Sequence, residues 1–172
     1  MNNWNMNKFW LLISLLSLFT LFSCDKEEET NEDVIAKMQK NKEDGEHFLK
    51  ALKSVEGVIC DDRGLLFRVD SEGVGSKPDD NDSVCIAYVG KRIDGKVFET
   101  VDTQVGMNEL MDGLYIGVRY MNQGAKHTLY LPYYLMYGAS SKTFYGESDT
   151  VTVEAYSALV YEMELKRVIK VD

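Results

Sequence analysis

Few cysteine and histidine side chains are available in this chain as nucleophiles or zinc ligands. The sequence holds three cysteines, Cys24, Cys60 and Cys85, and two histidines, His47 and His127. Neither Cys60 nor Cys85 stands in a Cys-x-x-Cys spacing, and two histidines alone do not complete a zinc site. We therefore expect no metal and no other cofactor, and the sequence offers no catalytic triad.

Cys24 is the cysteine with a recognisable chemical context. Residues 9–22 form an uncharged apolar run after Lys8. This run is shorter than the ~20 residues that a membrane-spanning helix needs. It is typical of a signal peptide, for which Met6 is an alternative start. Because the run ends in Leu21-Phe-Ser-Cys24, which resembles a bacterial lipobox, we expect removal of residues 1–23 and lipid on Cys24. The alternative is an ordinary secretory signal followed by an incidental cysteine.

Residues 24–32 form an acidic tether by composition. Like charges in Asp25-Lys-Glu-Glu-Glu29 repel and extend the chain, although the segment also resembles an export signal of cell-surface lipoproteins. A lipid anchor holds a chain to a membrane without spanning it. We therefore expect a lipoprotein of the bacterial envelope, at the outer membrane on its periplasmic face or on the cell surface. The net charge of −9, which becomes −10 once Lys8 is removed, argues against nucleic-acid binding.

The pairing of Cys60 and Cys85 is open on sequence grounds. An exported compartment permits a disulfide, but a bridge prefers a Cα separation of about 5.5–6 Å, which a sequence does not supply. Cys85 lies in a stretch with a strand pattern, where it can pack as a small hydrophobic side chain. We expect two unpaired thiols.

The stretch from Gly124 to Gly138 has the most informative pattern in the chain. Apolar and polar residues alternate from Thr128 to Leu131, which is the period of a half-buried strand. Pro132 has no N–H to donate and ends the strand. One turn later, Tyr137 stands beside a flexible corner at Gly138.

This order of Gly-x-x, strand, Pro and a later Tyr-Gly resembles the matching segment of FKBP-type peptidyl-prolyl isomerases. Two further blocks are similar to that family. They are Ile86-Ala-Tyr-Val-Gly90 with Asp94-Gly-Lys-Val-Phe-Glu99, and the closing strand Ala158-Leu-Val-Tyr-Glu-Met-Glu-Leu165. The resemblance covers roughly residues 64–168. Its lead-in, Asn41 to Val58, resembles the helical segment of macrophage-infectivity-potentiator-type isomerases, which are lipoproteins in the form expected here.

The resemblance implies catalysis of rotation about the X-Pro bond, which needs no nucleophile, metal or proton relay. The barrier of ~18–20 kcal/mol comes from amide resonance, and a catalyst must bind the twisted amide better than either planar isomer. A dry aromatic cup does so because water favours the more polar planar amide. A 10⁵-fold acceleration requires only ~7 kcal/mol of such differential binding.

The resemblance also implies a role for nine residues. Phe98 and Tyr161 would wall the proline ring and Leu114 would form the floor. The Tyr137 hydroxyl and the Met111 N–H would donate to substrate carbonyls, with Glu99 at the rim. The implied catalytic residues are Tyr88, Phe98, Glu99 and Tyr137, and the implied substrate-binding residues are Leu110, Met111, Leu114, Val153 and Tyr161.

The chain departs from the family pattern at the floor, the acid and the flap. Leu114 replaces the usual tryptophan, and Glu99 replaces the usual aspartate. Val153-Glu-Ala155 lacks the two prolines of the usual flap, which raises the cost of ordering that loop. Phe144 and Tyr145 are candidates to act as flap aromatics instead. We therefore expect weak isomerase activity.

The elements that must position these residues predict an α+β fold. We expect an FKBP-like curved antiparallel sheet with one short helix packed across it, over residues 64–172. The first strand is predicted at 65–69, a loop at 72–82, a strand at 83–89, a hairpin turn at Asp94-Gly95, and a closing strand near 159–165. The short helix is predicted at 111–121, with Gly124 as its left-handed cap.

An N-terminal helical segment is predicted over residues 33–57, within a helical pattern that begins at Thr30. Its apolar residues recur at spacings of three and four, and Gly45 could split it into two helices. The apolar stripe can pack on its own domain, which we favour, or on a second copy as a homodimer.

Three functions remain open from the sequence. The first is a lipid-anchored isomerase acting on proline-containing exported polypeptides. The second is a non-catalytic peptide-binding chaperone or adaptor with the same fold, and the third is a structural surface lipoprotein. The aromatic residues favour the first function, and the altered flap favours the other two.

Overall fold

The structure, a computed structural model, describes residues 30–146 and 149–171. The predicted signal peptide, Cys24 and residues 24–29 of the predicted tether lie outside the described residues. Within the described part of the chain, no helix is long and apolar enough to cross a membrane.

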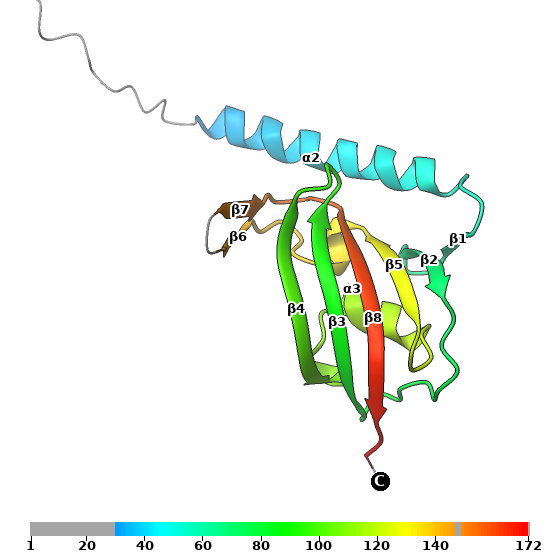
Figure 1. Ribbon diagram of the computed structural model, residues 1–172. Helices are drawn as coiled ribbons and strands as arrows, with labels where there is room; N and C mark the ends of the chain where they lie inside the picture. The colour runs from blue at the N-terminus through cyan, green and yellow to red at the C-terminus, as the bar shows by residue number, and fades with distance from the viewer. Residues whose placement is uncertain (1–29, 147–148, 172) are drawn as a thin grey trace, which may run out of the picture. The chain divides into compact units, whose positions relative to one another are not determined.

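Six antiparallel strands form the main sheet (Figure 1). In spatial order they are β1 (Val58–Cys60), β2 (Leu66–Ser71), β5 (Lys126–Leu131), β8 (Leu159–Ile169), β3 (Ser83–Arg92) and β4 (Val97–Gly106). A separate hairpin pairs β6 (Lys142–Tyr145) with β7 (Thr150–Val153). The predicted α+β architecture, an antiparallel sheet with one short helix, is confirmed.

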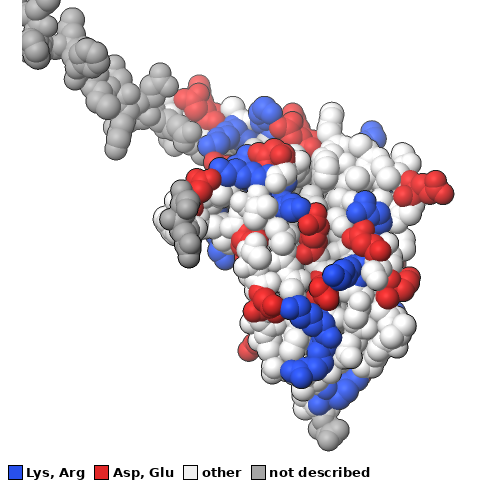
Figure 2. Space-filling view, viewed as in Figure 1, with Lys and Arg blue, Asp and Glu red and all other residues white. Residues whose placement is uncertain are grey.

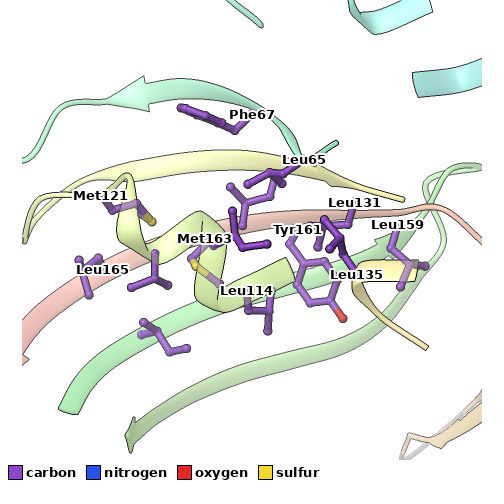
Figure 3. Packing of buried hydrophobic residues seen from close by; sticks show 14 of the residues in the cluster. Leu65, Phe67, Leu114, Met121, Leu131, Leu135, Leu159, Tyr161, Met163 and Leu165 are labelled. Atoms are coloured by element: carbon purple, nitrogen blue, oxygen red, sulfur yellow. The ribbon is translucent and has the colours of Figure 1, made fainter. Parts of the chain in front are cut away.

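The helix α3 (Asp112–Arg119) packs across the inner face of this sheet. The close approach of α3 to β5 depends on Gly117, because a Cβ there would lie 2.4 Å from Cδ1 of Leu129 on β5. The core between helix and sheet is apolar, with Leu131, Tyr161 and Leu165 fully buried (Figure 3). Two short 3₁₀ turns, η1 (Met107–Glu109) and η2 (Tyr133–Leu135), flank the helix and β5 in sequence.

The outer face of the sheet carries paired charges instead. Acidic and basic side chains alternate across β3, β4 and β8 (Figure 2), with ion pairs such as Lys166–Asp102 at 2.6 Å and Lys126–Glu164 at 3.3 Å. One face of the sheet is therefore exposed to solvent and the other is buried, as expected for an antiparallel sheet with a helix on one side.

The N-terminal helix α2 (Asn31–Leu52) is continuous, so Gly45 does not split it into two helices. Gly45 is buried against the main domain, where a Cβ would lie 2.9 Å from Cβ of Ala158. The glycine therefore permits close packing and does not end the helix. Leu49, with Phe48 and Leu52 beside it, packs into a second small core on the domain, which confirms the intramolecular interpretation for this half of the helix. Ile35, in the first half, stays 64% exposed.

Several predicted boundaries need correction. The short strand β1 precedes the strand predicted as the first, β3 extends to Arg92, and α2 ends at Leu52 instead of residue 57. Gly124 has the predicted positive φ, +90°, but it does not cap α3, whose C-cap is Tyr120. Gly124 instead lies in the turn that leads into β5, where its N–H donates to the carbonyl of Leu165. Cys60 and Cys85 are both free thiols, as expected.

Candidate active site

Aromatic rings from two strands and one turn surround Tyr161 on the inner face of the sheet. The ring centroid of Tyr161, on β8, lies 5.4 Å from that of Tyr88 on β3 and 5.9 Å from that of Phe98 on β4. The Tyr137 hydroxyl, from the turn after η2, lies 3.4 Å from the Tyr161 hydroxyl. The four aromatics predicted from the sequence therefore meet in one cluster, which we call the aromatic cluster.

A β-bulge explains how Phe98 and Glu99, adjacent in sequence, both reach Tyr161. Successive side chains of a regular strand point to opposite faces. Here Gly90 pairs with Glu99 while Lys91 pairs with Val97, so Phe98 is an extra residue in β4. The bulge lets the Phe98 ring contact Tyr161 while the Glu99 carboxylate accepts its hydroxyl hydrogen.

Gly90 supplies the space for this arrangement. It pairs with Tyr161 on one side and with Glu99 on the other. A Cβ at this position would lie 2.8 Å from Cζ of Phe98 and 2.9 Å from Cγ of Glu99. Sequence reasoning gave Gly90 no role, although a glycine inside a strand pattern is a signal for a bulge or a close approach.

A chain of hydroxyl groups runs from Glu99 to Tyr137. The Tyr161 hydroxyl donates to Oε1 of Glu99 at 2.7 Å. Since a phenol has one hydrogen, the longer contact of 3.4 Å requires Tyr137 to donate to Tyr161. The Tyr137 hydrogen therefore sits in a weak hydrogen bond, from which it can turn toward another acceptor.

Burial keeps these phenols protonated. It raises the pKa of Tyr88 to about 12, with the Glu99 charge as a smaller cause. It also raises the pKa of Tyr137 to about 12. The pKa of Tyr161 is raised further, first by burial and then by the charge of Glu99. All three hydroxyls are neutral hydrogen-bond donors at physiological pH, as an ordinary phenol is, and burial keeps them so at higher pH.

The predicted floor and walls are buried to different degrees. Leu114, on α3, is 4% exposed and belongs to the main core. Leu110 and Met111 are half-buried just before α3. The Met111 N–H donates to no backbone carbonyl among the described residues, as befits an N-cap position. Val153 is 1% exposed and packs inside the core.

Phe144, on β6, covers one side of the aromatic cluster. Its ring centroid lies 4.8 Å from that of Phe98 and 6.0 Å from that of Tyr137. The Lys142 Nζ lies 5.1 Å from the Tyr137 centroid and 5.3 Å from the Phe144 centroid. Tyr145, the other candidate flap aromatic, is 84% exposed and stands outside the cluster.

An open hollow of about 350 Å³ borders the cluster on the Phe98 side. Phe98, Glu99, Phe144 and Val151 contribute to its lining. Among the predicted site residues, Phe98 and Glu99 line this hollow, whereas Tyr88, Tyr137 and Tyr161 do not. Apolar rings next to a carboxylate can hold a small apolar ring and bind the peptide groups on either side of it. The described residues contain no group of three or more His, Cys, Asp or Glu side chains that could hold a metal ion.

Comparison with known proteins matches the chain to one protein family. The sequence model of the FKBP-type peptidyl-prolyl cis-trans isomerase family matches residues 75–166. The chain is 33% identical over 135 residues to the FKBP-type peptidyl-prolyl cis-trans isomerase FkpA of Aeromonas hydrophila, a match that covers 76% of this chain and 47% of the relative. It is 29% identical over 135 residues to the outer membrane protein MIP of Legionella longbeachae, covering 66% and 58% of the two chains. The chain thus spans about half the length of these curated relatives.

Solved structures show the same fold. A peptidyl-prolyl cis-trans isomerase of Pseudomonas syringae pv. tomato superposes with a TM-score of 0.68 at 27% identity, covering 77% of this chain and 96% of that one. FkpA of Escherichia coli gives a TM-score of 0.68 at 24% identity, covering 94% and 82%, and supports the fold alone. Since the family model matches more than half of the chain and the aromatic cluster lies inside the matched range, this chain belongs to the FKBP-type peptidyl-prolyl cis-trans isomerase family.

Proposed function

We propose that the protein is a weak peptidyl-prolyl cis-trans isomerase that assists the folding of exported polypeptides. The observation that carries this proposal is the convergence of Tyr88, Phe98, Tyr137 and Tyr161 beside the Glu99 carboxylate. Membership of an isomerase family supports the same reaction.

The proposed mechanism uses binding alone. As the X-Pro bond twists, its C–N double-bond character is lost and its planar polarity falls. A water-poor cluster of rings then binds the twisted peptide better than the planar one. Tyr137 turns its hydrogen from Tyr161 to a substrate carbonyl, while Glu99 stays fixed by the Tyr161 hydroxyl. Leu114 gives a smaller floor than tryptophan, so the acceleration is modest.

The test is isomerisation of a Leu-Pro or Phe-Pro tetrapeptide by the full chain in detergent. Phe98→Ala and Tyr137→Phe should each lower kcat/KM about tenfold, the effect of ~1.4 kcal/mol on the transition state. Tyr145→Phe is the matched control, because this tyrosine lies on the same hairpin as Phe144 and is 84% exposed. A wild-type rate no faster than that in buffer would reject the isomerase.

A second candidate is a peptide-binding chaperone without catalysis. Phe144 packs against both Phe98 and Tyr137, which leaves less apolar surface for a proline ring. This function predicts that the chain suppresses aggregation of an unfolded client, and that suppression persists in Phe98→Ala. Loss of both activities in the same variant would instead tie client binding to the aromatic cluster.

We also propose that residues 1–23 are a signal peptide and that Cys24 carries lipid at the outer membrane, ahead of the tether 24–32. The name of the Legionella relative places that protein at the outer membrane, which supports an envelope location. Growth with an alkyne fatty acid should label the wild-type chain but not Cys24→Ser. Label retained in Cys24→Ser would refute lipidation at this residue.

The exposed first half of α2 supports a homodimer proposal. Ile35 is 64% exposed there, and a second copy could cover it. Sedimentation velocity should show a dimer that Ile35→Glu dissociates, whereas a monomer at all concentrations would exclude it.

A further inference from the structure

Three contacts join α2 to the loop that follows β7. The Asn41 side chain donates from Nδ2 to the Ala155 carbonyl at 3.1 Å. Lys37 pairs with Glu154 at 2.9 Å. Gly45 packs against Ala158, where even one added methyl would clash. The helix therefore contacts the loop through residues on three successive turns, Lys37, Asn41 and Gly45.

The loop in turn is bonded at two points to the segment that connects Tyr137 to β6, the strand that carries Phe144. The Ala155 N–H donates to the Ser141 hydroxyl at 3.0 Å, immediately before β6. The Tyr156 N–H donates to the Gly138 carbonyl at 2.8 Å, immediately after Tyr137. Tyr156 holds a φ of +60°, a conformation that costs energy for a tyrosine and persists where surrounding contacts enforce it.

The hairpin transmits this position to the aromatic cluster. Lys142 pairs with Val153 and Phe144 pairs with Val151. The side chain of Val153 is buried in the core, and the ring of Phe144 lies against Phe98 and Tyr137. Ala155 lies two residues after Val153, the last residue of β7. A shift of Ala155 therefore moves β7, the strand that pairs with Phe144 on β6.

From these contacts we infer that α2 braces the β6–β7 hairpin, and that Asn41 is a positioning residue for Phe144 and Tyr137. Ala155 stands where the family pattern has proline in its flap. Proline would stiffen that loop through its own ring and would lack an N–H. Here the N–H and the carbonyl of Ala155 are both used, one by Ser141 and one by Asn41. The brace supplies from a distant helix the rigidity that proline supplies locally.

The inference rests on the proposed isomerase for its effect on turnover, but not for its effect on the hairpin. Asn41→Ala removes the bond to Ala155. Asn41→Asp keeps the shape and removes the donor, so it should act like Asn41→Ala. His47→Ala, at an exposed position of the same helix, is the matched control.

The primary measurement is amide hydrogen exchange in the full chain. Amides of the β6–β7 ladder should exchange about 3- to 10-fold faster in both Asn41 variants, the change that loss of one hydrogen bond makes in an opening equilibrium. Amides paired between β3 and β8 should not change, and His47→Ala should match the wild type. Unchanged exchange in the β6–β7 ladder would overturn the brace.

The second measurement is tetrapeptide isomerisation. Both Asn41 variants should lower kcat/KM about 3- to 10-fold, through a higher KM with kcat nearly unchanged, because a loosened hairpin must be ordered by the substrate. Combining Asn41→Ala with Ser141→Ala should give less than the sum of the single effects, since both hold Ala155. Faster exchange with unaltered kcat/KM would refute the positioning role. Faster exchange in a wild type that does not isomerise would keep the brace and reject the proposed function.

Discussion

Replacing Tyr161 by phenylalanine separates stability from catalysis in the aromatic cluster. The substitution removes one oxygen and keeps the ring that packs against Tyr88 and Phe98. Glu99 then loses the hydroxyl that donates to it at 2.7 Å. A hydrogen bond to a charged group contributes about 1.5–3 kcal/mol. Glu99 is only half-buried, so water replaces part of the lost bond, and we expect a loss near the lower end, about 1–2 kcal/mol.

The same change should leave turnover intact. Tyr161 accepts the Tyr137 hydrogen at 3.4 Å in the free protein, and without this acceptor Tyr137 donates to substrate unopposed. We therefore expect kcat/KM of Tyr161→Phe to stay within about threefold of wild type, or to rise, which corresponds to less than ~0.7 kcal/mol. Tyr137→Phe should show the reverse pattern. It loses only a long hydrogen bond, so its stability should change by less than about 0.5 kcal/mol, while its kcat/KM falls about tenfold.

Urea denaturation and tetrapeptide isomerisation measure the two quantities on the same preparations. A Tyr161→Phe variant that keeps wild-type stability would mean that the Glu99 bond contributes nothing. A variant that loses turnover as severely as Tyr137→Phe would show that the Tyr161 hydroxyl itself acts on the substrate, and the proposed division of roles would be wrong.

Three further predictions follow from buried groups. Burial lowers the pKa of His127 below its usual 6.5. Stability should therefore be full above pH 6.5 and fall as the pH drops toward the folded pKa, by at most ~1.4 kcal/mol per pH unit. Urea denaturation from pH 7.5 to 5 should lose this slope in His127→Gln, and an unchanged slope would assign it elsewhere. Gly90→Ala should cost about 1–3 kcal/mol in urea denaturation and lower kcat/KM, because its Cβ meets the Phe98 ring at 2.8 Å; wild-type values would refute this crowding. Gly45→Ala should destabilise the chain, although alanine favours a helix by up to ~1 kcal/mol, and Ala158→Gly should restore the loss; a stabilised single variant would show that α2 can move away.

The sequence predicted elements whose rules are local. The Asp94-Gly95 turn formed as expected, with φ of +85° at Gly95 and Asp94 accepting from the Lys96 N–H. Pro132 ends β5 as expected. These features depend on the conformational limits of one or two residues, and neighbours far away in sequence do not alter them.

The bulge in β4 lies beyond such rules. A regular strand places Phe98 and Glu99 on opposite faces, so the resemblance to a family, not the strand period, brought both to the site. The bulge becomes visible only in the register of the two strands, where Gly90 pairs with Glu99 and Lys91 pairs with Val97. Likewise, the hydrogen bond between Tyr161 and Glu99 joins residues 62 positions apart, and no local sequence pattern at either residue predicts it.

The flap shows why a local rule can be correct and still mislead. Loss of proline does free a loop in isolation, because alanine has more backbone conformations to lose on folding. The inference of a costly, loosely ordered flap then assumes that nothing else holds the loop. In the fold, Asn41 bonds Ala155 from 114 residues away, and Ser141 bonds its N–H. A proline at 155 would abolish the second bond, so the residue that stiffens this loop in isolation would remove one of the contacts that stiffen it here.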